Sequence, residues 1–160
     1  GDADTGHGDG FLVLGLGLSL APVGAYLAVV GHFDTIPLLF SAIVFTWVSG
    51  FDILYALQDE AFDKANHLKS IPVLLGRHRA MYFSRFLHFI TASIVVFIGL
   101  YHLPTVYYGV GALLFVGLLF YQHTLLTPND ISKVNVAFGT TNGIASFLFS
   151  LFVILSILFH

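Results

Sequence analysis

The sequence lacks cysteine and is poor in charged residues. Without cysteine, the chain can form no disulfide and cannot bind a metal through thiolates. Charged residues account for 9% of the 160 residues, whereas a soluble domain carries about 25%. Hydrophobic residues account for 57%, so the composition indicates an integral membrane protein with a lipid bilayer as its partner. The chain also has no basic patch, which argues against binding to nucleic acid.

Five apolar runs are long enough to cross a membrane as helices, because a spanning helix needs about 20 residues. They cover approximately residues 11–31, 36–57, 79–101, 105–126 and 134–159. The runs are continuous rather than alternating, which argues against strands. The sequence therefore predicts an all-α, polytopic transmembrane helix bundle over residues 11–160. Residues 1–10 are polar and rich in glycine, and we expect them to form a flexible leader.

The basic residues are distributed unevenly between the connections. Those between the first and second runs and between the third and fourth runs contain no lysine or arginine. Loops rich in lysine and arginine remain on the cytoplasmic side of a membrane. We therefore expect segments 58–78 and 127–133 to be cytoplasmic and the C-terminus to lie on the opposite side. The basic residues are Lys64, Lys69, Arg77, Arg79, Arg85 and Lys133.

Acidic residues gather at the end of the second apolar run. Asp52, Tyr55, Asp59 and Asp63 are spaced so that, on one continuous helix, they fall within about an 80° arc. A carboxylate in a membrane costs about 2.5–3.5 kcal/mol and persists when it is paired, hydrated or bound to a metal. An alternative interpretation is a solvated helix end with Lys64 and Lys69 as the counter-ions of its acids.

Carboxylates without histidine or cysteine are ligands for a hard cation such as Mg²⁺. Mg²⁺ in proteins is bound by one or two carboxylates and completes its shell with water and substrate phosphates. Lys69 and Arg77 follow the acids and are suited to bind the same phosphates. A phosphate at the edge of an apolar bundle indicates a lipid-like substrate, with its head at the membrane surface and its tail among the helices.

The spacing of these residues resembles the second aspartate-rich motif of the UbiA superfamily, the intramembrane aromatic prenyltransferases. The matching pattern is Asp52-x-x-Tyr55-Ala-x-x-Asp59-x-x-x-Asp63, followed by Lys69-Ser70. The segments "SIPVLLG" and "YQHTLLTPNDISKVNVAFGTTNGIAS" are similar to the branch of 4-hydroxybenzoate polyprenyltransferases. The likeness extends from about residue 11 to residue 159.

The resemblance implies a reaction and a role for each residue. The family transfers a polyprenyl group from its diphosphate to an aromatic acceptor, such as 4-hydroxybenzoate in bacterial quinone biosynthesis at the inner membrane. Asp59 and Asp63 would bind Mg²⁺ that bridges the diphosphate, and Lys69 would neutralise further phosphate charge. Tyr55 would face the developing carbocation, and Asp52 would orient the acceptor.

Asparagine and histidine side chains in the spans are further candidates for function. Asn135 and Asn142 are seven residues apart and would share a face of one α-helix. Asparagine in a membrane usually bonds to another helix; the alternative is that Asn142 lines the substrate cavity. The eight histidines show no spacing typical of a metal-binding pair, and His123, next to Gln122, is the best candidate for a functional one.

Family members have about nine spanning helices and two aspartate-rich motifs, whereas this sequence contains only the second motif. The resemblance therefore implies the C-terminal half of an enzyme, partnered by an N-terminal half with the first motif and inactive on its own. Two alternatives remain open. One is transfer to another ring, such as a menaquinone precursor or a chlorophyllide-like ring. The other is a non-catalytic membrane subunit or a transporter that uses the acids as an ion path.

Overall fold

The computed structural model describes the backbone of residues 10–159 and the side chains of this range except those of residues 10–14 and 138. Most of the expected leader, residues 1–9, lies outside this range. Every named element in it is a helix. In chain order these are α1 (Gly10–Val30), α2 (Thr35–Ala56), α3 (Glu60–Ala65), α4 (Ile71–Leu75), α5 (Arg77–Tyr101), α6 (Val106–Thr124), the π-helix η1 (Val136–Thr141) and α7 (Asn142–Leu158).

Four of these elements are long and apolar enough to cross a membrane. They are α2, α5, α6 and the helical stretch Gly139–Leu158. The described apolar part of α1, Gly15–Val30, is shorter. The all-α, polytopic class predicted from composition is confirmed, and the molecule is an integral membrane protein.

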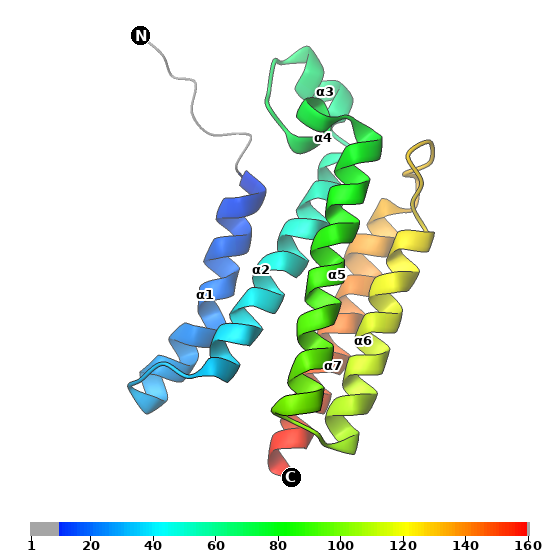
Figure 1. The fold of residues 1–160 in the computed structure, drawn as a ribbon. Coiled ribbons are helices and arrows are strands. Elements are labelled where there is room, and N and C mark those ends of the chain that lie inside the picture. The colour runs from blue at the N-terminus through cyan, green and yellow to red at the C-terminus, as the bar shows by residue number, and fades with distance from the viewer. Residues whose placement is uncertain (1–9, 160) are drawn as a thin grey trace.

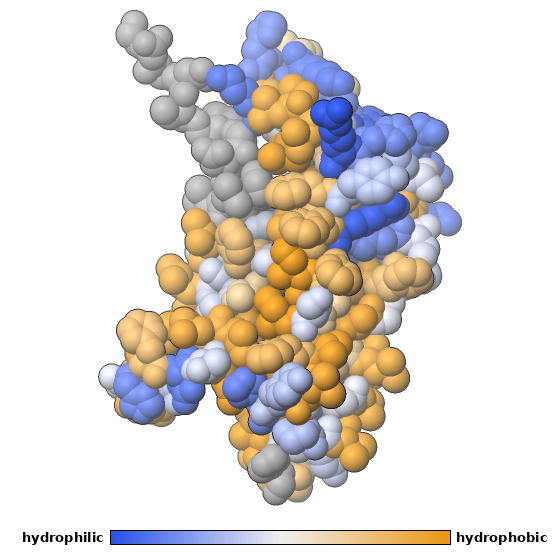
Figure 2. Space-filling model, viewed as in Figure 1, coloured by the Kyte–Doolittle hydropathy of each residue, from blue (hydrophilic) through white to orange (hydrophobic). Residues whose placement is uncertain are grey.

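The connections sort to the two ends of the bundle (Figure 1). The short helices α3 and α4 and the α6–α7 connection lie at one end, and the α1–α2 and α5–α6 connections lie at the other. Figure 2 shows hydrophilic surface over the α3–α4 end and apolar surface along the helices below it. The loops that contain lysine and arginine therefore share one end, as their alternation along the sequence predicts.

Side-chain caps and one glycine define where the helices begin. At the start of α2, the Asp34 carboxylate accepts the backbone N–H of Thr35 at 2.5 Å. At the start of α6, the Thr105 hydroxyl accepts the backbone N–H of Tyr108 at 3.1 Å. Such caps satisfy N–H groups that have no partner within the helix. Gly76 separates α4 from α5 with a φ of 79°, a conformation that favours glycine.

The core consists of two clusters stacked along the bundle. The first joins α2, α5, α6 and α7 through residues such as Ile43, Val95, Phe115 and Phe149. The second lies closer to α3 and α4, and it includes Leu54, Leu57, Ala80, Met81, Leu126 and Val134. Because the second cluster lies beneath the α3–α4 segment, it anchors the part of the chain that contains the acidic motif.

Candidate functional site

The acidic motif lies where α2 ends and not on one continuous helix. Helix α2 stops at Ala56, residues 57–59 form a turn, and α3 begins at Glu60. Leu57 is fully buried and Glu60 is nearly so, so the chain turns inward where α2 ends. The expectation that one helix carries all four polar residues through Asp63 is therefore wrong. We call residues 57–77 the rim segment.

Asp59 and Asp63 keep their one-turn spacing within the rim segment. Asp59 directly precedes α3 and Asp63 lies in its first turn. The backbone N–H of Asp63 donates to the carbonyl of Asp59 at 2.8 Å. Side chains four residues apart on a helical turn are neighbours, with Cβ atoms about 5–6 Å apart. Asp59 is exposed and Asp63 is half-buried, so both stay candidates for ligands of one cation at the surface.

Asp52 and Tyr55 stay on α2, three residues apart and on one face of the helix. Asp52 is half-buried and Tyr55 is exposed. Within residues 10–159, the Asp52 carboxylate has no hydrogen-bond partner. A carboxylate in a spanning helix is costly unless it is paired or hydrated. The α2 helix therefore presents a polar face that leads from the bundle toward the rim segment.

Glu60 is the buried acceptor that organises the rim segment. Its carboxylate accepts Lys64 Nζ at 2.6 Å and Arg77 Nε, so it joins α3 to the start of α5. Burial tends to raise the pKa of Glu60, but the hydrogen bonds and positive charges of Arg77 and Lys64 outweigh burial and lower it. Lys64 thus neutralises Glu60 and is not the counter-ion of Asp59 or Asp63 that the alternative interpretation expected.

Two other candidate phosphate ligands also lie at the rim. Arg77 is held there by Glu60, and the hydrogen bond described for it uses only Nε of the five N–H donors of a guanidinium. Lys69 lies between α3 and α4 and is exposed. The candidate ligands for a cation and for phosphate are therefore all on one short stretch of chain, residues 59–77.

The two asparagines of the last helix do not play equivalent parts. Asn135 accepts a hydrogen bond from the Gln58 amide at 3.4 Å, which ties the α6–α7 connection to the rim segment. Asn142 follows a π-helix, and its buried Oδ1 has no partner. A π-helix contains more residues per turn than an α-helix and often marks a functional site. The spacing argument that put both asparagines on one α-helical face therefore does not apply.

The rim suits an ion that is held jointly by protein and substrate. Among the described residues, no three histidine, cysteine, aspartate or glutamate side chains converge on a point. Mg²⁺ does not need such a cage, because it commonly takes one or two carboxylates and completes its shell with water and phosphate oxygens. Asp59 and Asp63 fit this pattern.

A second polar cluster lies inside the bundle. His88 of α5 and His123 of α6 are joined through Nδ1 and Nε2 at 2.7 Å, and His88 Nε2 lies 3.1 Å from the Trp47 carbonyl of α2. Sequence spacing could not reveal this pair because the two residues are 35 positions apart. The polarity of His123 near a helix end was the only signal.

Three comparisons relate the chain to known proteins. A sequence profile of the UbiA prenyltransferase family matches residues 9–157. A protein named 4-hydroxybenzoate octaprenyltransferase, from Tolumonas auensis, is 30% identical over 139 residues; the match covers 87% of this chain and 48% of that protein. The apo structure of a UbiA homolog from Aeropyrum pernix K1 matches with a TM-score of 0.78 and 23% identity, over 94% of this chain and 56% of that one. The chain thus spans about half the length of either relative.

Proposed function

The chain belongs to the UbiA prenyltransferase family, and from this premise we propose that it forms the diphosphate-binding half of a membrane prenyltransferase. The reaction proposed is transfer of a polyprenyl group from its diphosphate to an aromatic acceptor. The relative from Tolumonas auensis supports 4-hydroxybenzoate as the acceptor and quinone biosynthesis as the context. The observation that carries the proposal is the one-turn spacing of Asp59 and Asp63 in the segment that Glu60 joins to Arg77.

In this proposal the acids and bases of the rim segment bind the head of the donor. Asp59 and Asp63 would hold Mg²⁺, which would supply Lewis-acid assistance to the leaving diphosphate. Lys69 and Arg77 donate to phosphate oxygens, and Glu60 fixes the direction of the Arg77 side chain. Because these groups lie at the end of an apolar bundle, the prenyl tail lies along the helices.

The deeper polar groups act on the acceptor side of the reacting carbon. Tyr55, one turn below Asp59, presents its ring to the developing allylic cation, which a π-face attracts. Asp52, a further turn down, accepts a hydrogen bond from the hydroxyl group of the acceptor and sets the orientation of its ring. In this proposal Asn142, whose buried Oδ1 has no partner, lines the substrate cavity.

The remaining half of the site comes from sequence that the relatives have and that this chain does not span. With one aspartate-rich motif, this half binds the donor, and turnover needs the first motif as well. The rim segment faces the cytoplasm, because the connections that contain lysine and arginine lie at that end of the bundle. In a bacterial cell the membrane is the inner membrane.

Calorimetry in detergent tests the site directly. Geranyl diphosphate, a short-chain donor, should bind the purified chain with Mg²⁺ and release on addition of EDTA. Asp63→Asn should weaken this binding by at least about tenfold, since a metal ligand is lost. Asp130→Asn is the matched control, because Asp130 is an exposed aspartate in the α6–α7 connection at the same end of the molecule. Binding that survives both EDTA and Asp63→Asn would refute the proposed role.

A further inference from the structure

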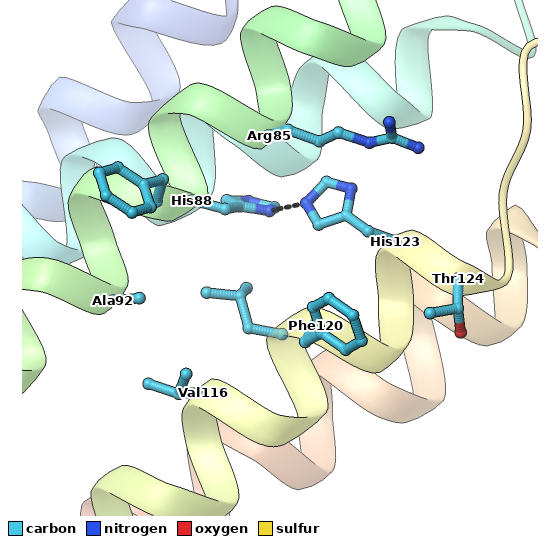
Figure 3. Close-up of a pocket in the computed structure, with 9 residues that line it drawn as sticks. Arg85, His88, Ala92, Val116, Phe120, His123 and Thr124 are labelled. Carbon is cyan, nitrogen blue, oxygen red and sulfur yellow. Dashed lines mark hydrogen bonds between the residues drawn. The ribbon is translucent and has the colours of Figure 1, made fainter.

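A pocket of about 630 Å³ lies between α5 and α6, apart from the rim segment. Its volume falls within the range of about 300–1,000 Å³ found for ligand sites. Figure 3 shows Arg85, His123 and Thr124 toward one end and Ala92 and Val116 toward the other. The pocket is therefore polar at one end and apolar at the other.

The hydrogen bonds of His88 and His123 show that the polar end of the pocket lacks one hydrogen-bond donor. The Trp47 carbonyl can only accept, so His88 Nε2 carries a proton and donates to it. With both rings neutral, His88 Nδ1 then accepts from His123 Nε2. This leaves His123 Nδ1 as an acceptor, and it is buried without a partner. His123 lines the pocket, so the wall holds one unsatisfied acceptor, and a small shift of the ring would present it to a ligand that carries a hydrogen-bond donor.

Arg85 adds a positive charge beside that acceptor. It is the ninth residue of α5, about 12 Å along the helix from its first residue. Its guanidinium lies 5.6 Å from the ring centroid of Tyr82, and within residues 10–159 no carboxylate pairs with it. A cation in a spanning helix is costly without a counter-ion. The pocket is therefore suited to an anion.

The direction of the pocket matches that of a membrane lipid. Arg85 lies in the third turn of α5 and Thr124 is the last residue of α6, so the polar end is nearer the α3–α4 end of the bundle. The apolar end lies deeper. Phe89 and Phe120 line the pocket and are 69% and 73% exposed, so the pocket opens onto the outer surface of the helices.

We propose that this pocket binds an anionic phospholipid whose headgroup has a free hydroxyl, of the phosphatidylglycerol type. The phosphate lies against Arg85, the hydroxyl donates to His123 Nδ1, and an acyl chain follows the apolar wall inward. Basic pockets between spanning helices are known to receive anionic headgroups. The inference does not rest on the prenyl diphosphate site, because Arg85 and His123 take no part in it.

Native mass spectrometry of the full chain, freed of lipid in detergent, tests the proposal with three lipids. These are phosphatidylglycerol, phosphatidylmethanol, which is anionic but lacks the hydroxyl, and zwitterionic phosphatidylcholine. One phosphatidylglycerol should be retained, about fivefold more tightly than phosphatidylcholine because of the arginine. It should also be retained about two- to tenfold more tightly than phosphatidylmethanol because of the hydrogen bond.

Variants separate the two contacts. Arg85→Gln should bring the affinities for phosphatidylglycerol and phosphatidylcholine to within about twofold of each other. Arg79→Gln should leave both affinities unchanged. Arg79 is the matched control, an exposed arginine on the same helix that does not line the pocket. His123→Phe should abolish the preference over phosphatidylmethanol and keep the preference for anionic lipids.

Several results would overturn the proposal. Equal retention of the three lipids by the unmodified chain would do so without any variant, even if a substitution prevented folding. If Arg79→Gln reduced the preference for phosphatidylglycerol over phosphatidylcholine as much as Arg85→Gln does, only diffuse surface charge would attract the lipid. One-for-one displacement of phosphatidylglycerol by 4-hydroxybenzoate would assign the pocket to an aromatic acid instead.

Discussion

The guanidinium Nε of Arg77 donates a hydrogen bond to the buried carboxylate of Glu60, which joins the first residue of α5 to the first residue of α3. Lys64 occupies the other oxygen of the same carboxylate. Among the described residues, the Asp59 and Asp63 carboxylates have no hydrogen-bond partner. The rim segment therefore uses one acid for structure and leaves two for a ligand.

Glu60→Gln should loosen the rim segment without removing any proposed ligand. An amide at this position keeps one acceptor but loses the charge that holds Arg77 and Lys64. We expect the free energy of unfolding to fall by about 1–2 kcal/mol, less than for a fully buried pair because both basic side chains are partly exposed. Chemical unfolding followed by circular dichroism measures this, with Asp130→Asn as control. An unchanged free energy of unfolding would mean that the pair does not stabilise the segment.

The Glu60 contribution should also depend on pH in a defined direction. The folded state lowers the pKa of Glu60 below its ordinary value of 4.5, because the charges of Arg77 and Lys64 outweigh the effect of burial. A lowered pKa means that the stabilisation is fully present above the unfolded pKa and is lost as pH falls through the folded pKa. The difference in unfolding free energy between the unmodified chain and Glu60→Gln should be constant from pH 7 to about pH 5 and shrink below about pH 4. A difference that grows on acidification would contradict this assignment.

Hydropathy predicted the helices because each spanning helix needs one continuous run of apolar residues. Such a run can be recognised in the sequence without knowledge of tertiary contacts. The break after Ala56 could not be predicted in the same way. It coincides with the burial of Leu57 among residues distant in the chain and with the ion pairs of Glu60 to Lys64 and Arg77. The motif spacing nevertheless located Asp59 and Asp63 one turn apart. Both residues lie at the start of α3, where four residues still correspond to about one helical turn. The pairing of His88 with His123 arises from tertiary packing alone.

Asp59 and Asp63 should behave as one unit if they share a cation. Each single change to asparagine should weaken Mg²⁺-dependent binding of geranyl diphosphate, because each removes a charged ligand. The double variant should be little worse than either single variant, since groups that act on one ligand are not additive. Calorimetric titration of the unmodified chain, the two single variants and the double variant completes this double-mutant cycle. Losses that simply add would indicate two independent sites on the rim.

Gly50→Ala tests the packing that places His88. A Cβ at Gly50 would lie 2.4 Å from Cδ2 and Nε2 of the His88 ring, so the imidazole would have to move. That movement would break the hydrogen bond from His88 to the Trp47 carbonyl. We expect the free energy of unfolding to fall by about 1–3 kcal/mol, the usual effect of overpacking a core.

Gly17→Ala is the matched control for this change, because a Cβ at Gly17 would meet no atom within 4 Å. It should be neutral or slightly stabilising, since alanine favours a helix over glycine by up to about 1 kcal/mol. Thermal unfolding in detergent, monitored by the fluorescence of Trp47, reports both variants, because Trp47 is the single tryptophan of the chain. Equal unfolding temperatures for Gly50→Ala and the unmodified chain would show that the His88 ring has room to shift, and the close contact between α2 and α5 would not be what holds the histidine pair in place.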